Sequence, residues 1–266
     1  MNTAEKKMAD NLLWNSTTAL NLNTQTLTQL FEGQIPAIII RSFLSSQSCD
    51  TITSNLKHLG METYSHVCHP VGRLGLAQME FHLKNQKSEY FNKTSEAREI
   101  YRQAIAGADD PMKKLIGYLQ HSNSKSVELA SESPDLPYFA GTFRNVMTVG
   151  HMHFDFAPFE ATGWAISKII NQLSWNLYLN QPEGGDLRVY ERFYLPSDES
   201  KRVPDGYWYE KEIVREYRSY TYSPKVGDLV MFNSRNFHEV EPVTGDRFSL
   251  SSFIGKTDEG KLLLWS

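Results

Sequence analysis

The pattern of apolar positions in the first half of the chain predicts helices around one strand. Residues 37–41 form a β-branched run that is typical of a buried strand. A helix is expected over 45–59, because serine precedes and glycine follows its apolar positions. Two more helices are expected over 94–106 and from Pro111 to about residue 121, since proline favours the first helical position. Residues 122–137, which are rich in polar residues and contain two prolines, are expected to form a loop.

After residue 138 the pattern changes to short segments rich in aromatic and β-branched residues. Turn signals such as Glu183-Gly184-Gly185 separate them. The segments expected to be strands are 142–148, 151–156, 173–179, 186–193, 217–222, 228–232, 237–241 and 248–254. Many short strands at this spacing are typical of a sandwich or barrel. We therefore predict one α+β domain, with a helical support region over 1–137, flexible over 1–20, and a β-core over 138–266.

Composition and charge narrow the class of protein. The chain has 266 residues, with 27 Lys and Arg against 31 Asp and Glu, so no global basic surface points to nucleic acid. The longest aliphatic run, 37–40, is far shorter than the roughly 20 residues that span a bilayer. The N-terminus has no apolar signal region, and only two cysteines are present, which disfavours a disulfide framework. A cytoplasmic protein without membrane or nucleic-acid partners is expected.

The segment from Gly150 to Asp155 carries the first candidate chemistry. Alternate residues of a strand share a face, so His153 and Asp155 can reach the same metal ion. A third ligand must come from a distant strand, and His238 is the candidate. Two histidines and one carboxylate leave three positions open on an octahedral ion, as in the facial triad of non-haem Fe(II) oxygenases.

Arg247 and Ser249 extend this pattern. Arg247 follows His238 by nine residues across the turn at residues 244–246, so a hairpin returns it to the strand of that histidine. Ser249 lies two positions further and should face the same way. A guanidinium beside a hydroxyl suits a carboxylate ligand deep in a barrel, because arginine binds carboxylates through two parallel hydrogen bonds.

These motifs resemble the Fe(II)/2-oxoglutarate-dependent oxygenases. The resemblance covers roughly residues 138–256 and implies a double-stranded β-helix, or jelly roll, with Fe(II) at its mouth. It assigns Fe(II) to His153, Asp155 and His238, and the distal carboxylate of 2-oxoglutarate to Arg247, Ser249 and Tyr178. Arg144 on the preceding strand is expected to meet the other end of 2-oxoglutarate. The implied reaction uses O₂ to hydroxylate an unactivated C–H bond, and 2-oxoglutarate leaves as succinate and CO₂.

Within that family, the size and N-terminal layout are most similar to enzymes that act on free small molecules. These are the hydroxylases of N-acylated amino acids and the carrier-independent halogenases of alkaloids. The halogenases have Gly or Ala where this chain has Asp155, and that substitution frees a metal position for chloride. Asp155 fills the position, so hydroxylation of an amino-acid derivative or specialised metabolite is expected.

Two alternative functions remain at the level of sequence. A cupin-type metalloenzyme would use His151, His153, Glu160 and His238 and would need no 2-oxoglutarate, leaving Arg247 without a role. A peptide or protein hydroxylase would use the same triad on a larger substrate. His151, Phe156 and Trp175 are further candidates for the pocket. A charge-balanced segment over 199–218, inserted between core strands, is expected to close over the substrate.

Overall fold

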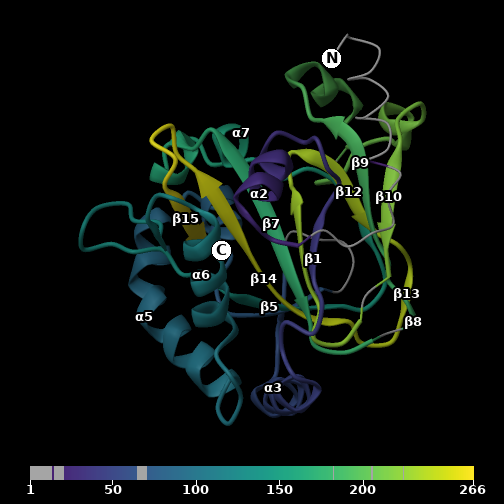
Figure 1. Cartoon of the computed structure of the whole chain (residues 1–266). Helices are drawn as coiled ribbons and strands as arrows, with labels where there is room; N and C mark the ends of the chain where they lie inside the picture. The colour runs from purple at the N-terminus through teal and green to yellow at the C-terminus, as the bar shows by residue number, and fades with distance from the viewer. Residues whose placement is uncertain (1–13, 15–20, 65–70, 182, 205, 224) are drawn as a thin grey trace.

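The computed structural model describes residues 14, 21–64, 71–181, 183–204, 206–223 and 225–266. Two mainly antiparallel sheets face one another, and helices cover the outer face of the larger sheet (Figure 1). This arrangement is the jelly-roll core with an added helical layer that the sequence predicts.

The helices begin and end where the sequence provides caps. In α3 the hydroxyl of Ser45 accepts the backbone N–H of Ser48, and in α6 the carboxylate of Asp110 accepts the N–H groups of Met112 and Lys113. The helices are α2 (Thr24–Phe31), α3 (Ser46–Leu59), α4 (Gln78–Leu83), α5 (Lys87–Ala104), α6 (Pro111–Ser122) and α7 (Ala157–Glu160), with 3₁₀ turns η1 (Ala165–Lys168), η2 (Pro196–Lys201) and η3 (Lys211–Val214).

The larger sheet is built around its longest strand, β14, which pairs with β7, β5 and β15. The strand order is β1 (Ile38–Ile40), β11 (Leu229–Asn233), β7 (Asn171–Tyr178), β14 (Phe248–Lys256), β5 (Thr142–Val146), β3 (Val71–Leu74) and β2 (Glu62–Thr63). The far end of β14 pairs with β15 (Leu262–Trp265), which in turn pairs in parallel with β4 (Val127–Leu129). One face of this sheet packs on α2, α3 and α6 through buried aliphatic side chains.

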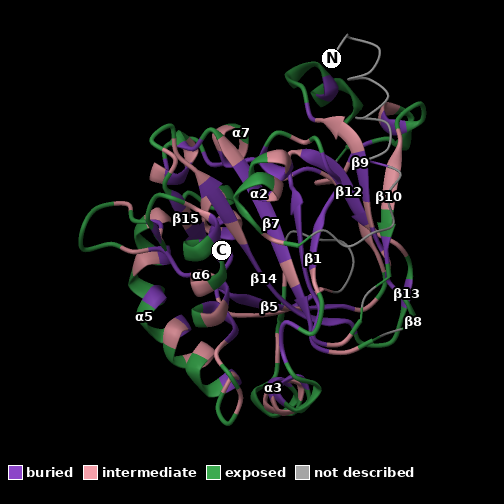
Figure 2. Cartoon of the chain, viewed as in Figure 1, coloured by how far each residue is buried: buried purple, intermediate pink, exposed green. Residues whose placement is uncertain are grey.

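The smaller sheet faces the other side of the larger one. Its order is β10 (Ser219–Tyr222), β9 (Leu187–Phe193), β12 (Asn236–Val240) and β6 (Gly150–His153). A short ladder between β8 (Glu183–Gly184) and β13 (Val243–Thr244) closes one end. Tyr178, Val189 and Phe232 meet between the two sheets, and buried residues dominate these strands in Figure 2.

The structure confirms most expected strands and corrects several details of the first half. The second helix begins at Lys87 rather than Thr94, which is buried inside α5 and donates its hydroxyl hydrogen to the Phe91 carbonyl. Strands β1 to β4 join the larger sheet, so the helical support region also contributes strands to the core. Most of the expected N-terminal arm lies outside the described residues, but Trp14 is buried and donates its indole N–H to the Gly33 carbonyl. None of the helices in the described ranges is both long and apolar enough to cross a bilayer.

Candidate metal centre

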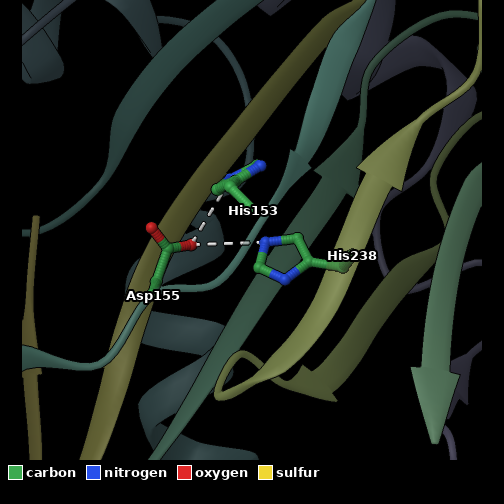
Figure 3. A group of neighbouring side chains, drawn as sticks. All are labelled: His153, Asp155 and His238. Carbon is green, nitrogen blue, oxygen red and sulfur yellow. Dashed lines mark ion pairs between the residues drawn. The ribbon is translucent and has the colours of Figure 1, made fainter. Parts of the chain in front are cut away.

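Three side chains from two neighbouring strands converge at one end of the smaller sheet. His153 is the last residue of β6 and lies directly opposite His238 in the register with β12. Asp155 follows two residues after His153, and its Oδ2 lies 3.3 Å from Nε2 of His238 and 3.8 Å from Nε2 of His153. Figure 3 shows the Asp155 carboxylate directed toward both imidazoles. One ligand atom from each residue lies within 4.8 Å of the others.

The main chain orients both imidazole rings. Nδ1 of His153 lies 2.6 Å from the carbonyl oxygen of His151, and Nδ1 of His238 lies 2.9 Å from the carbonyl oxygen of Asn236. A neutral ring that donates its Nδ1–H to a carbonyl presents the lone pair of Nε2, which is the usual geometry of a metal-bound histidine. In both residues Nε2 is the atom that faces Asp155.

The electrostatics favour a neutral His153 and an ionised Asp155. Burial, together with the neighbouring His238, lowers the pKa of His153 to about 4. Burial alone would raise the pKa of Asp155, but the neighbouring His238 and His153 outweigh it and lower the pKa. Ligands at right angles on an ion about 2.1 Å away are separated by roughly 3 Å, close to the observed spacings. The three residues therefore fit one face of an octahedral divalent ion.

A buried arginine, Arg247, lies inside the barrel directly before β14, the strand next to that of Tyr178. The side chain of Arg247 is 3% exposed; its Nε donates to the Gly185 carbonyl at 3.0 Å and its terminal nitrogen to the Tyr178 hydroxyl at 3.4 Å. Ser249, also buried, lies opposite Tyr178 on β7 and opposite Arg144 on β5. Within the described residues, no carboxylate forms an ion pair with Arg247; Asp186 acts on it through its charge alone, and burial lowers the pKa of the guanidinium. A buried cation in this state is a site for an anionic ligand.

Gly185 explains how Arg247 reaches this position. A Cβ atom on Gly185 would lie only 2.9 Å from Cδ of Arg247, and the backbone φ of 74° favours glycine. Glycine at position 185 is thus a steric requirement of the arginine.

Arg144 faces the same interior from the neighbouring strand. Its Nε donates to the Tyr64 hydroxyl at 3.1 Å, and a terminal nitrogen contacts the Ser251 hydroxyl. Its charge acts on both His153 and Asp155. Strand alternation from Ser249 could have identified Ser251. No local signal links Tyr64 to this site, because Tyr64 and Arg144 are 80 residues apart in the sequence.

The additional pocket candidates divide between two faces. His151 shares the face of His153, and its ring stacks on Trp208. Phe156 instead packs with Met152 and Phe154 on the outer face of the smaller sheet. Trp175 lies on the helix side of the larger sheet, opposite to the face of Tyr178. Phe156 and Trp175 are therefore not pocket residues, because each points away from the interior that holds the triad.

The geometry also separates the triad from the four-residue cupin set. The cluster of ligand atoms found in the described part of the chain contains His153, Asp155 and His238, but neither His151 nor Glu160. The carboxylate of Glu160 accepts the backbone N–H of Phe156 at 2.6 Å.

Two aromatic residues near the triad were not singled out by the sequence patterns. Tyr207 and Trp208 lie in the predicted closing segment between β9 and β10, where the structure has η2, a tight turn and η3. The ring of Tyr207 meets His153 edge-on at a centroid distance of 5.2 Å.

Comparisons with known proteins agree with this geometry. Residues 10–266 match the family described as carrier-protein-independent halogenase WelO5. The leucinostatins biosynthesis cluster protein S of Purpureocillium lilacinum is 33% identical over 214 residues, covering 74% of this chain and 86% of the relative. The L-γ-glutamyl-L-propargylglycine hydroxylase of Streptantibioticus cattleyicolor is 27% identical over 249 residues, covering 90% of this chain and 91% of the relative.

The fold is similar to that of solved oxygenases. An N-substituted L-amino acid dioxygenase from Burkholderia ambifaria, in complex with α-ketoglutarate, superposes with a TM-score of 0.62 at 12% identity over 91% of both chains. HygX from Streptomyces hygroscopicus, with nickel and 2-oxoglutarate bound, superposes with a TM-score of 0.52 at 11% identity, covering 89% of this chain and 87% of HygX. Since the family match spans nearly the whole sequence, the chain belongs to the carrier-protein-independent halogenase WelO5 family of Fe(II)/2-oxoglutarate-dependent oxygenases.

Proposed function

We propose that His153, Asp155 and His238 hold the Fe(II) of this dioxygenase and that Arg247, Ser249 and Tyr178 bind the distal carboxylate of 2-oxoglutarate. The observation that carries the assignment is the buried Arg247, which forms no ion pair with a carboxylate in the described part of the chain and shares the barrel interior with the triad. An anion bound there would satisfy the guanidinium and the two hydroxyl groups beside it. Arg144 is assigned to the other end of 2-oxoglutarate.

The residues around the centre favour hydroxylation over halogenation. When bound, Fe(II) and 2-oxoglutarate supply the oxidising chemistry, with O₂ as oxidant and succinate and CO₂ as coproducts. Asp155 would occupy one coordination position and would place a negative charge where an incoming chloride would have to bind. The imidazoles of His153 and His238 are held by main-chain carbonyls, so each would present its Nε2 to the ion in a fixed direction.

We propose an amino-acid derivative substituted on its nitrogen as the substrate. The curated hydroxylase relative acts, by its name, on a γ-glutamyl amino acid, and the Burkholderia neighbour on N-substituted L-amino acids. The net charge of −4 gives no support for nucleic acid as substrate. A cytoplasmic location is part of the same proposal, supported by the low cysteine content and the free, buried Cys49.

Substrate-stimulated succinate formation tests this function. The protein is incubated with Fe(II), 2-oxoglutarate, O₂ and a panel of N-acetyl, N-succinyl and γ-glutamyl amino acids, with the free amino acids as matched controls. We expect one or more N-substituted compounds to raise succinate formation and to gain one oxygen atom by mass spectrometry. Stimulation by the free amino acids alone would contradict the substrate class, and no 2-oxoglutarate binding at all would contradict the site.

A further inference from the structure

A tight turn between β9 and β10 docks on β6, the strand that carries His153. We call this turn, residues 202–204 and 206–209, the strap. The backbone N–H of Val203 donates to the Trp208 carbonyl at 2.9 Å, which closes the turn. The N–H of Tyr209 donates to the Met152 carbonyl at 2.9 Å, so the strap is attached to β6, an edge strand of the smaller sheet. The position of the strap relative to the triad is therefore set by the main chain.

The strap presents two aromatic rings to the metal centre. Trp208 stacks on His151 with ring centroids 4.5 Å apart and planes inclined by 27°. Tyr207 meets His153 edge-on at 5.2 Å. Both side chains are half-buried, and neither carries a charge, so they give this side of the centre a mainly apolar surface.

Two neighbours hold these rings in place. The ring of Trp208 lies so close to Gly206 that a Cβ atom there would be 2.8 Å from the indole. Tyr209 anchors the strap on the outer face of the sheet, where it packs with Phe154 and Phe237 and donates its hydroxyl hydrogen to Glu199 at 2.9 Å. Tyr207 and Trp208 are thus presented by a turn that is fixed on both sides.

We infer that Tyr207 and Trp208 form the wall of the substrate pocket beside the metal and select substrates whose oxidised part is apolar. The inference rests on the proposed function and adds the residues that read the substrate. Arg144 and Ser249 come from strands of the larger sheet and Arg247 directly precedes one, whereas the strap places two aromatic rings against the histidines of β6. A side chain to be hydroxylated must lie close to the metal, so it contacts these rings.

Two dipeptides of nearly equal size provide the test. In γ-glutamyl-L-leucine and γ-glutamyl-L-asparagine, the side chains have similar shape but differ in polarity. The kcat/KM for succinate formation and the Kd for protein loaded with Ni(II) and 2-oxoglutarate are measured for both, the Kd by calorimetry. The variants are Tyr207→Ala, Trp208→Ala and Gly206→Ala, with Tyr207→Phe as the conservative change. Tyr217→Ala is the matched control, because Tyr217 belongs to the same inserted segment but is 47% exposed and contacts Arg192.

We expect the wild type to prefer the leucine dipeptide and the two alanine variants of the wall to lose about tenfold or more of that preference, a range typical of apolar pockets. Gly206→Ala should lower the preference by displacing Trp208, whereas Tyr207→Phe and Tyr217→Ala should keep it. The affinity for 2-oxoglutarate should stay within about twofold of the wild type in every variant, which also shows that each variant is folded.

The remaining outcomes each contradict a different statement. Equal losses on both dipeptides would mean that the strap has only a structural role. A wild type that binds 2-oxoglutarate but prefers the asparagine dipeptide, or binds neither dipeptide, would overturn the inference that the pocket selects an apolar side chain. A wild type that does not bind 2-oxoglutarate would contradict the proposed function itself.

Discussion

The guanidinium of Arg247 lies over the ring of Tyr178, 4.9 Å from its centroid, and donates to the hydroxyl of the same residue. Ser249 is the cross-strand neighbour of Tyr178, so the three side chains converge from two adjacent strands. Tyr178 thus contacts the cation through its face and its hydroxyl, and this pairing keeps a buried charge oriented toward the barrel interior.

Arg247→Ala should raise the KM for 2-oxoglutarate by more than tenfold. Losing one partner of a desolvated charge pair costs about 2–5 kcal/mol. Tyr178→Phe removes one hydrogen bond of about 0.5–1.5 kcal/mol and should raise the same KM by only a few-fold. The exposed Arg215→Ala is the control. An unchanged KM for 2-oxoglutarate with a raised substrate KM would place Arg247 at the substrate instead.

Gly185→Ala should weaken 2-oxoglutarate binding without touching any proposed ligand of it. The new Cβ would force Cδ of Arg247 away from a separation of 2.9 Å, and the left-handed backbone would cost about 1–2 kcal/mol. Gly245→Ala is a matched control, because its φ of 82° imposes a similar backbone cost with no atom within 4 Å of the added Cβ. Calorimetry should show a weaker Kd in the first variant alone, while urea unfolding should show a loss of stability in both. Equal Kd values would separate Gly185 from the arginine.

Removing any triad residue should abolish stoichiometric metal binding. His153→Ala, Asp155→Ala and His238→Ala each delete one of three ligands, and elemental analysis after Fe(II) loading under nitrogen measures the metal retained. His151→Ala is the comparison, because its side chain stacks on Trp208 and lies outside the ligand cluster. We expect this variant to keep its metal. Loss of metal from His151→Ala, with retention in Asp155→Ala, would favour a cupin-type site.

The wild type should hydroxylate its substrate even at high chloride. A carboxylate at Asp155 fills a metal position and repels a halide, so mass spectrometry of the product should show added oxygen and no chlorine. Sodium nitrate at the same ionic strength controls for salt effects. Chlorination as the main reaction of the wild type would refute this role of Asp155.

The sequence predicted the parts of this protein that depend on local geometry. Alternation along the chain brings His153 and Asp155 together, and this relationship is visible within a short stretch. The expected hairpin that returns Arg247 to the strand of His238 is wrong, because β12 belongs to the smaller sheet and Arg247 leads into β14 of the larger sheet, so the connection crosses between the sheets. The strands of the second half follow for the same reason, since each has its own periodicity and turn signal. The jelly-roll expectation is confirmed by the arrangement of these strands.

The face of the sheet toward which a side chain points was less predictable. Strand β7 is buried on both faces, so its pattern does not reveal that Trp175 faces the helices while Tyr178 faces the interior. Phe156 was expected in the pocket but packs on the outer face of the smaller sheet. Aromatic residues lie on both faces there, so the sequence pattern does not separate them. Arg144 and Tyr64 are 80 residues apart in the sequence, so no local pattern predicts their contact.

The carbonyl groups that orient His153 and His238 belong to the backbone two residues earlier in each strand. Any amino acid that is compatible with the strand supplies the same carbonyl. The side chains at positions 151 and 236 are therefore not needed to orient the two histidines. Position 151 also borders the strap. Natural variation there can therefore reshape the wall that meets the substrate while the imidazole tautomers are preserved, and this separation allows new substrates to be acquired without rebuilding the metal centre.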